Sequence, residues 1–556
     1  MTANVNIEAA PAVNVTSTAR LATLLLGAAV LTACAFAFVG LTSEGYWTDE
    51  LFSVFLINHH GGLAEVWRRA LTDTHPPLYY FLLWGWAQVF GQSEIALRSL
   101  SALLCVGAVA VFIAGTHRLF SLNARLFAAA VAVTSPFWFT QSQNARNYTL
   151  CFLFGAILLV LAIRARDAAR QGRPIPALTL AGLGLFGALN AFTHFYAFLA
   201  VGLLYLFLIL TTPSLRLRVT LALCGVAIFV TELAYIRVLL HSTQQNTHDM
   251  WFRSDVPFFL QQTYVAAQEM IGPGALAALA ALATTFVWSK VRRTRPAAPL
   301  TPGVWWTIAL AGFLIGGVMA GGIAISLILA PSYSNMNLLV ASPFLWPALA
   351  AAFDAANARA PGRWTLVAAG VPALAMTVQL VSQYERWLPR GEAWRESARL
   401  VLDQRGCAGQ PIPVVLPAKF GPPTPFFRDL AQHDFYGYYF AGQEARLQPL
   451  RAAEVLDPAR NPTLRARAAP GTCRVLAWAV HDIDKPRALA FAAHLAAAAG
   501  LPRDKIETVM FTTSHPTWTY SKWIEVGFVF LRREPEHLSL PPLGEVPAKR
   551  GMGAPA

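Results

Sequence analysis

Eleven long apolar runs constrain this chain more than any other feature of its sequence. Apolar runs near 20 residues long cross a lipid bilayer as helices. Hydrophobic residues make up 55% of the chain and charged residues only 13%, which is too little charge to cover a water-soluble protein of this size. The sequence therefore predicts a mostly α-helical, polytopic membrane bundle of about eleven spans. The runs cover about 21–41, 96–116, 126–143, 149–164, 177–193, 196–211, 219–240, 274–290, 304–330, 337–353 and 364–382.

The short connections between these runs alternate between basic and non-basic. Lys and Arg gather in the connections near 117–125, 164–173, 216–218, 290–295 and 359–363, which carry much of the net charge of +13. Basic loops stay on the cytoplasmic side of a membrane, so this charge does not indicate nucleic-acid binding. The pattern predicts a multi-pass protein of the bacterial inner membrane. Its N-terminus lies inside, and its first loop and everything after about residue 383 face the periplasm.

The last third of the chain differs in character from the apolar runs. It contains short β-like runs at 413–416, 474–479 and 523–531 and an Ala-rich helix near 487–499. The sequence predicts a periplasmic α/β domain over 384–540, after a bundle over 20–383 that includes a first outer loop at 42–95. Residues 1–19 and 541–556 are predicted to be disordered.

Six cysteines fall into two groups. Cys407 and Cys473 lie in the polar C-terminal region, where an oxidising compartment would allow a disulfide between them. The other four lie inside apolar runs and are expected to be inert: Cys34, Cys105, Cys151 and Cys224.

Two adjacent carboxylates, Asp49 and Glu50, follow the first apolar run directly. Thr48 or Asp49 can cap a helix over about 49–60, and Glu50 in its first turn is favoured by the helix dipole. A carboxylate held in this way also suits a general base or a metal ligand. The residues alone leave both interpretations open.

A second polar cluster reads Asp73-Thr74-His75-Pro76-Pro77-Leu78-Tyr79-Tyr80. Pro76 keeps His75 out of helical geometry, and the Pro pair can open the amphipathic helix that follows. An imidazole on such a corner can contact a phosphate or a carboxylate. The alternative is the start of an interfacial helix with a Tyr and Trp belt.

Two arginines break the positive-inside pattern at predicted outer corners. Arg98 begins the second apolar run, and Arg146 lies between two runs, just before Tyr148. A guanidinium suits a forked grip on phosphate, whereas the alternative is a structural ion pair. His194, just before Tyr196, lies at another outer corner. We therefore expect these groups to converge at the membrane surface on an anionic lipid.

These segments, in this order, resemble the GT-C glycosyltransferase superfamily. The nearest branch contains the protein O-mannosyltransferases and the lipid A aminoarabinose transferase. The resemblance covers roughly residues 20–400 and ends in a Glu-Ala-Trp-Arg-Glu segment at 392–396. It rests on the acidic pair, His75-Pro76-Pro77-Leu78-Tyr79, Ala145-Arg146-Asn147-Tyr148 and Thr193-His194-Phe195-Tyr196.

The resemblance implies a polyprenyl-phosphate sugar donor and an inverting transfer to an extracytoplasmic acceptor, which is a cell-envelope glycan, lipopolysaccharide or lipid A, or a protein. It implies Asp49 as the catalytic aspartate, with Glu50 beside it. Donor-phosphate binding is expected of His75, Arg98, Arg146, Tyr148 and His194. Support of the acceptor is expected of Asp73, Tyr79 and Tyr196. No metal-binding residue is predicted, although a divalent cation is left open as a cofactor.

The chain departs from this resemblance in one place. After Tyr333, relatives often carry Arg-Tyr, whereas this chain reads Asn335-Met336-Asn337. The alternative functions are a transporter or lipid flippase, for which Glu232 is a candidate buried charge, and a non-catalytic assembly protein.

Overall fold

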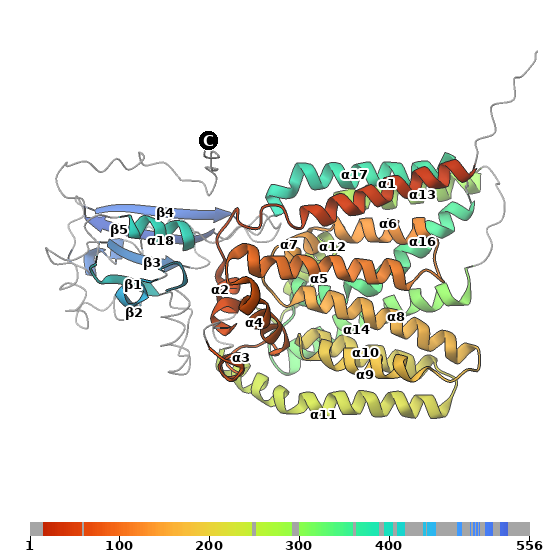
Figure 1. The fold of residues 1–556 in the computed structure, drawn as a ribbon, viewed down its shortest axis with the longest axis horizontal. Coiled ribbons are helices and arrows are strands. Elements are labelled where there is room, and N and C mark those ends of the chain that lie inside the picture. Colours follow the sequence, from red (N-terminus) through yellow and green to blue (C-terminus); the bar gives the residue numbers. More distant parts are fainter. Residues whose placement is uncertain are drawn as a thin grey trace, which may run out of the picture.

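The computed structural model describes two parts of the chain, a helical bundle and a β-sheet region (Figure 1). The described residues are 15–57, 61–246, 252–291, 300–359, 363–387, 394–403, 409–416, 437–440, 442–451, 475–480, 506–514 and 523–531, with a few single residues between 490 and 500. Cys407, Cys473, residues 1–14 and residues 532–556 lie outside them. The predicted disulfide and the predicted disorder of both termini therefore fall outside the described residues, except that α1 already begins at Val15 rather than at residue 20.

Helices make up most of the described chain, which confirms the predicted fold class. The bundle contains α1 (Val15–Phe36), α5 (Glu94–Gly115), α6 (Leu122–Val133), α7 (Pro136–Ser142), α8 (Tyr148–Arg170), α9 (Ala177–Ala191), α10 (Phe195–Thr211), α11 (Leu215–Asn246), α12 (Val256–Met270), α13 (Pro273–Val291), α14 (Pro302–Ile328), α15 (Asn335–Leu338), the 3-10 segment η2 (Leu339–Leu345), α16 (Trp346–Arg359) and α17 (Arg363–Trp387).

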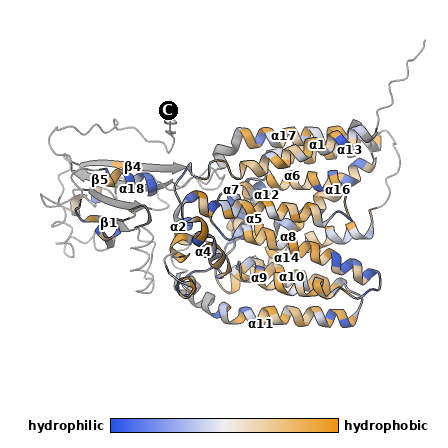
Figure 2. Cartoon of the chain, in the orientation of Figure 1, coloured by the Kyte–Doolittle hydropathy of each residue, from blue (hydrophilic) through white to orange (hydrophobic). Residues whose placement is uncertain are grey.

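All eleven predicted apolar runs coincide with helices of this bundle, and the helices are apolar along their length (Figure 2). Within the described residues, six helices have the length and apolarity of a membrane span, and a seventh span forms if α12 and α13, bent by 77°, count as one. Helices α6, α9 and α10 are apolar but shorter. The number of spans, predicted as about eleven, stays a prediction.

Small residues let the helices approach closely. On α1, Ala22, Leu26, Ala29 and Ala33 are buried and recur every three or four residues, so they form one face against α6 and α17. At Gly115, a Cβ atom would overlap the side chain of Val160, so the end of α5 packs on α8 without room for a side chain. This close contact lies at the C-terminal end of α5, whereas the first loop leads into the start of α5 at Glu94.

Side chains define where several helices begin. The Ser93 side chain accepts a hydrogen bond from the Ala96 N–H at the start of α5, and Ser135 does the same for Trp138 at the start of α7. Three short helices lie beside these starts at one end of the bundle: α2 (Thr48–Ile57), α3 (Leu63–Ala70) and α4 (Leu78–Phe90).

The second part is a five-stranded sheet with the order β2-β1-β3-β5-β4. β1 pairs in parallel with β2 and β3, whereas β5 pairs antiparallel with β3 and β4. Three of the strands, β1, β3 and β5, coincide with the predicted β-like runs. The elements are α18 (Trp394–Leu402), β1 (Ile412–Leu416), η5 (Tyr438–Phe440), η6 (Glu444–Arg446), β2 (Leu447–Arg451), β3 (Val475–Val480), β4 (Ile506–Ser514) and β5 (Trp523–Leu531).

The sheet lies at the same end of the bundle as α2, α3 and α4, which we call the sheet end (Figure 1). The opposite end carries the C-terminal end of α8, with Arg170 in its last turn. The domain boundaries predicted at 383 and 540 stay predictions.

Candidate active site

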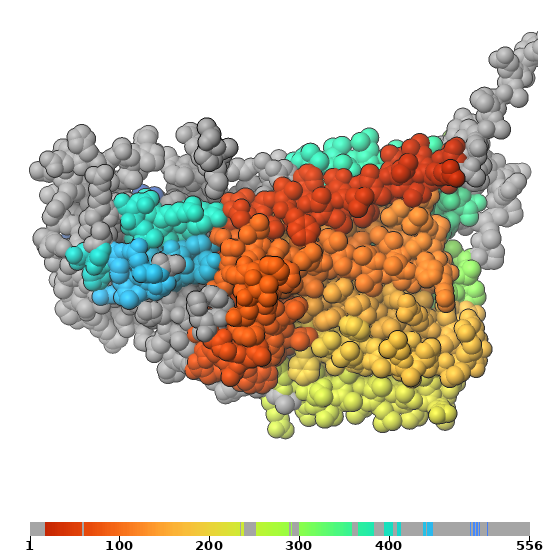
Figure 3. Space-filling view, in the orientation of Figure 1, coloured from red at the N-terminus to blue at the C-terminus, as the bar shows by residue number. Residues whose placement is uncertain are grey.

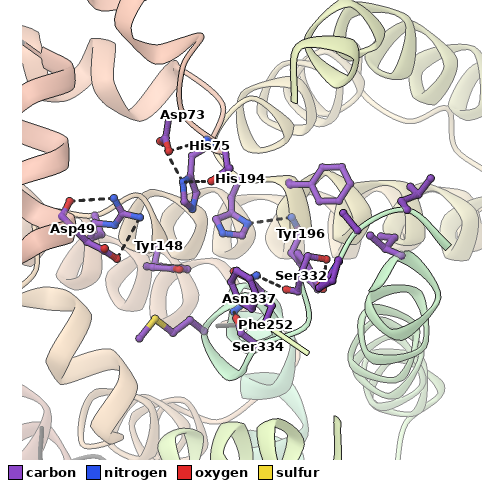
Figure 4. A pocket seen from close by; sticks show the side chains of 18 of the residues that line it. Asp49, Asp73, His75, Tyr148, His194, Tyr196, Phe252, Ser332, Ser334 and Asn337 are labelled. Carbon is purple, nitrogen blue, oxygen red and sulfur yellow. Dashed lines mark hydrogen bonds and ion pairs between the residues drawn. The ribbon is translucent and has the colours of Figure 1, made fainter. Parts of the chain in front are cut away.

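A cavity of about 290 Å³ opens at the sheet end of the bundle. Its lining comes from the first loop, the corners before α8 and α10, and the segment between α14 and α15. Figure 4 shows these side chains converging from elements far apart in the sequence. The lining residues are Asp49, Phe52, Asp73, Thr74, His75, Arg146, Tyr148, His194, Phe195, Tyr196, Phe252, Ile325, Leu329, Ala330, Pro331, Ser332, Ser334, Met336 and Asn337.

Asp49 lies in the first turn of α2, and its carboxylate reaches the cavity. The carboxylate is 43% exposed, and its Oδ2 atom lies 3.7 Å from Nη2 of Arg146. Arg146 also donates from Nη1 to the Asp49 backbone carbonyl at 3.2 Å. The ion pair is therefore loose. The carboxylate can still accept a proton, or a hydrogen bond from a hydroxyl group.

Arg146 is a buried cation at the wall of this cavity. Its side chain is 7% exposed, and among the described residues Nε has no hydrogen-bond partner. The corner that carries it is fixed on both sides, because the Ala145 N–H donates to Glu50 at 2.9 Å and Asn147 donates to the Thr193 carbonyl at 2.9 Å. A buried guanidinium with an open donor suits an anionic ligand.

Asp73 and His75 form an acid–imidazole pair on the loop before α4. Nδ1 of His75 lies 3.2 Å from Oδ2 of Asp73, and Tyr80 donates to the same oxygen at 2.5 Å. Burial alone would raise the pKa of Asp73, but His75, Arg146 and the Tyr80 hydroxyl lower it to about 2. Asp73 is therefore an ionised acceptor that directs Nδ1–H of His75 toward itself and leaves Nε2 for a ligand.

His194 caps α10, and its ring lies beside that of His75 in the cavity wall. Its Nδ1 accepts a hydrogen bond from the Tyr196 N–H at 3.0 Å, so the proton of the neutral ring sits on Nε2. Burial, together with the positive charges of His75 and Arg146, lowers the pKa of His194 well below its usual value. Its ring centroid lies 5.3 Å from that of His75 and 5.3 Å from that of Tyr148. His194 is thus a neutral N–H donor.

The opposite wall of the cavity is apolar with a few hydroxyl and amide groups. Ile325, Leu329 and Pro331 supply apolar surface from the end of α14 and the segment after it. Ser332 hydrogen-bonds to the Tyr196 hydroxyl at 3.2 Å, and Asn337 donates to the Ser332 carbonyl at 2.7 Å. Such a wall suits the lipid part and the hydroxyl groups of one ligand.

Glu50 and Arg98 lie outside the cavity, although both were predicted as site residues. They form a fully buried pair in which Nε of Arg98 donates to Oε1 at 2.8 Å and Nη2 donates to Oε2 at 2.6 Å. Tyr79 is also buried and does not line the cavity. These three residues shape the surroundings of the site and do not reach a ligand within it.

The cavity brings together seven of the ten predicted site residues: Asp49, Asp73, His75, Arg146, Tyr148, His194 and Tyr196. Sequence reasoning did not predict Ser332, Ser334 and Asn337 as site residues. The departure noted near Asn335 pointed at this segment, but Asn335 itself donates to buried Glu269 at 2.6 Å. In the part of the chain that the structure describes, no group of three or more His, Cys, Asp or Glu side chains is placed to hold a metal ion.

Comparisons with known proteins agree with this geometry. Residues 74–235 match the family model of dolichyl-phosphate-mannose-protein mannosyltransferases. No curated protein matches the whole-chain sequence.

Two solved structures of one bacterial protein share the fold along nearly the whole chain. Apo ArnT from Cupriavidus metallidurans aligns with a TM-score of 0.51 at 13% identity, over 92% of this chain and 98% of that one. ArnT bound to undecaprenyl phosphate aligns with a TM-score of 0.50 at 13% identity, over 91% and 97%. The chain therefore shares the fold of ArnT, and the segment that matches the mannosyltransferase family model lies within the helical bundle.

Proposed function

We propose that this protein transfers a sugar, with inversion, from a polyprenyl-phosphate donor to an acceptor at the periplasmic face of the bacterial inner membrane. One observation carries the proposal. A half-exposed carboxylate, Asp49, and a buried guanidinium with an open donor, Arg146, meet in one cavity at the sheet end of the bundle.

The cationic and N–H groups of the cavity suit the donor phosphate. Arg146 supplies a permanent positive charge, and His75 in its protonated form supplies Nε2–H opposite its Nδ1 bond to Asp73. His194 adds a neutral N–H. Fixed donors of this kind stabilise the charge that grows on the phosphate as it leaves.

Asp49 is the proposed general base. The acceptor oxygen attacks the anomeric carbon of the sugar on the face opposite the phosphate, and the acceptor proton passes to the Asp49 carboxylate. The bond between the anomeric carbon and the phosphate oxygen breaks, and polyprenyl phosphate leaves with the electron pair. One displacement of this kind inverts the anomeric configuration.

The apolar wall formed by Ile325, Leu329 and Pro331 suits the first isoprene units of the lipid. Undecaprenyl phosphate, the ligand of the ArnT structure, is a lipid of this class. The acceptor is proposed to be a cell-envelope glycan, lipopolysaccharide or lipid A, or a protein. The sheet region lies at the same end as the cavity, so a domain over 384–540 would face that acceptor.

The alternation of basic loops supports the orientation. Arg170, in the predicted basic connection 164–173, lies at the end of α8 opposite Tyr148, which lines the cavity. Loops rich in Lys and Arg remain cytoplasmic, which puts the cavity on the periplasmic side.

The test uses purified protein in lipid nanodiscs with radiolabelled polyprenyl-phosphate sugars and an extract of envelope glycans and proteins. Wild type should form a labelled covalent product, and Asp49→Asn should not. Asp167→Asn, an acid paired with Arg166 at the far end of α8, is the matched control and should behave as wild type. Transport of the lipid across proteoliposomes without any covalent product would replace this proposal by a flippase or transporter.

A further inference from the structure

Five consecutive backbone carbonyls, those of residues 41–45, each accept a hydrogen bond from an arginine. Arg98 of α5 donates to the carbonyls of Leu41 at 2.7 Å, Glu44 at 2.9 Å and Gly45 at 2.9 Å. Arg395 of α18 donates to the two between them, Thr42 at 3.1 Å and Ser43 at 3.2 Å. We call residues 41–45 the clamped strand, although they form a turn and no β-strand. It leads directly into α2, whose first turn carries Asp49.

The two arginines reach the clamped strand from different parts of the molecule. Arg98 belongs to the bundle, and its five bonds, two to Glu50 and three to the clamped strand, use all five of its N–H donors. Arg395 belongs to α18, which packs against β5 and η5 of the sheet region. Figure 3 shows atoms of the sheet region in contact with those of the first loop.

Glu94 joins the two parts. It lies one helical turn before Arg98 on α5, and its Oε1 accepts from Arg395 at 3.4 Å and from the Tyr439 hydroxyl at 2.9 Å. The Tyr439 hydroxyl in turn accepts from the Tyr46 N–H at 2.5 Å. The sheet region is thus bonded to Glu94 at the start of α5 and to Tyr46, the residue that follows the clamped strand.

Gly45 is the point of closest approach. A Cβ atom there would lie 2.9 Å from Cβ of Arg395 and 3.1 Å from the Tyr439 hydroxyl. Any side chain would push the sheet region away from the strand. The absence of a side chain at this position therefore allows the arginine to reach the carbonyls.

We propose that Arg395 is a positioning residue for Asp49. Docking of the sheet region through Arg395 fixes the clamped strand, and the strand fixes the start of α2 and hence the Asp49 carboxylate against Arg146. The sheet region then contributes to the transfer reaction, because it helps to position the Asp49 carboxylate. This inference rests on the proposed function, because it concerns the same carboxylate.

The position of the Asp49 carboxylate depends on the backbone before it. Asp49 is held only loosely by Arg146, at 3.7 Å, so its position depends on the backbone that carries it. A misplacement of about 1 Å at a reacting group can cost roughly 100-fold in rate. Loss of the Arg395 bonds leaves two carbonyls of the strand without these partners and frees the strand on one side.

The experiment compares four variants of the full-length protein in nanodiscs. Arg395→Ala removes the bonds from α18, Arg395→Lys keeps the charge without the fork, and Gly45→Ala keeps Arg395 but inserts a methyl group at the closest approach. Arg399→Ala, an exposed residue of the same helix, is the matched control. Hydrogen exchange of the amides of residues 41–50 and the kcat and donor KM for transfer are measured on each.

Arg395→Ala and Gly45→Ala should speed exchange in residues 41–50 and lower kcat by about 10-fold, with donor KM within about twofold of wild type. Arg395→Lys should recover part of the kcat, and Arg399→Ala should match wild type. Unchanged exchange in Arg395→Ala would overturn the proposal, as would faster exchange with an unchanged kcat. The exchange measurement needs no substrate, so an error in the proposed function would show itself separately, as inactive wild-type protein.

Discussion

Asp49 and Glu50 are neighbours in the sequence, and each is paired with an arginine, but the two pairs are built differently. Glu50 is fully buried and accepts two bonds from Arg98, at 2.8 and 2.6 Å. Asp49 is 43% exposed and lies 3.7 Å from Arg146, whose Nε has no partner among the described residues. One pair is closed and the other is open to the cavity.

The difference shows how one acidic dipeptide can serve structure and chemistry at once. A buried ion pair holds its geometry when every donor is satisfied, as in Arg98, and it offers nothing to a ligand. A partly exposed acid can exchange protons with a ligand, and a buried cation beside it can bind an anion. We therefore propose a role in folding for Glu50 and Arg98 and a role in the transfer reaction for Asp49 and Arg146.

The largest expected effect comes from Asp49→Asn. Loss of the general base should lower kcat by about 1000-fold. The melting temperature should change little, because the carboxylate is half exposed and its ion pair is loose. Steady-state transfer and thermal unfolding of the same preparation measure both. If Asp49→Asn lost its fold along with its activity, the Asp49 and Arg146 pair would be structural as well.

Glu50→Gln should show the reverse behaviour. It leaves the buried Arg98 charge without its counter-charge, which we expect to lower the free energy of unfolding by about 3 kcal/mol. Asp255→Asn is the control, since Asp255 pairs with exposed Arg253 and Asn can keep the cap of α12, so this change should cost less than about 1 kcal/mol. Denaturant titration in detergent compares the two. Equal stability of both variants would contradict a structural role for Glu50.

Arg146→Gln sharpens the comparison from the side of the cation. Removing the charge should lower kcat/KM for the donor by about 100-fold, because the phosphate loses its permanent counter-charge. Arg170→Gln, at the far end of α8, the helix that begins just after Arg146, should leave kcat/KM unchanged. Initial rates over a range of donor concentrations decide the matter. Similar rates for Arg146→Gln and wild type would mean that the donor phosphate does not bind at Arg146.

The smallest effect is expected for Asp73→Asn. His75 loses its orienting carboxylate, which should lower kcat by about 10-fold. The pKa of Asp73 is lowered to about 2, so the stability that its ionised form contributes is present at neutral pH and is lost only as the pH falls through about 2. The difference in melting temperature between wild type and Asp73→Asn should therefore persist from about pH 8 down to about pH 5. Its disappearance by pH 5 would mean that the carboxyl group protonates in this range.

Much of this arrangement was predictable from the sequence, because hydrophobic runs fix the helices and their ends fix the corners. Arg146 and His194 each lie between two apolar runs, His75 lies in the first outer loop on the same predicted side, and the three meet in the cavity. The alternation of basic and non-basic loops was sufficient to predict that all three lie on the same side of the membrane.

The roles of the neighbouring acids could not be predicted in this way. Successive residues of a helix point about 100° apart, so Asp49 and Glu50 face different surroundings, and only the packing of α5 brings Arg98 to one of them. The segment of Ser332 and Asn337 carries no charge, and only the departure from relatives at 335–337 pointed to it, without showing which of its side chains line the cavity. The partners of Arg395 are backbone carbonyls, which sequence patterns do not reveal.

The most direct test of the central claim is a cryo-EM structure of wild-type protein in nanodiscs with undecaprenyl phosphate. The account predicts phosphate density beside the Arg146 guanidinium and within hydrogen-bond distance of His75, with the polyprenyl chain along Leu329 and Pro331. Phosphate density at the opposite, basic end of the bundle, with the Asp49 cavity empty, would contradict it.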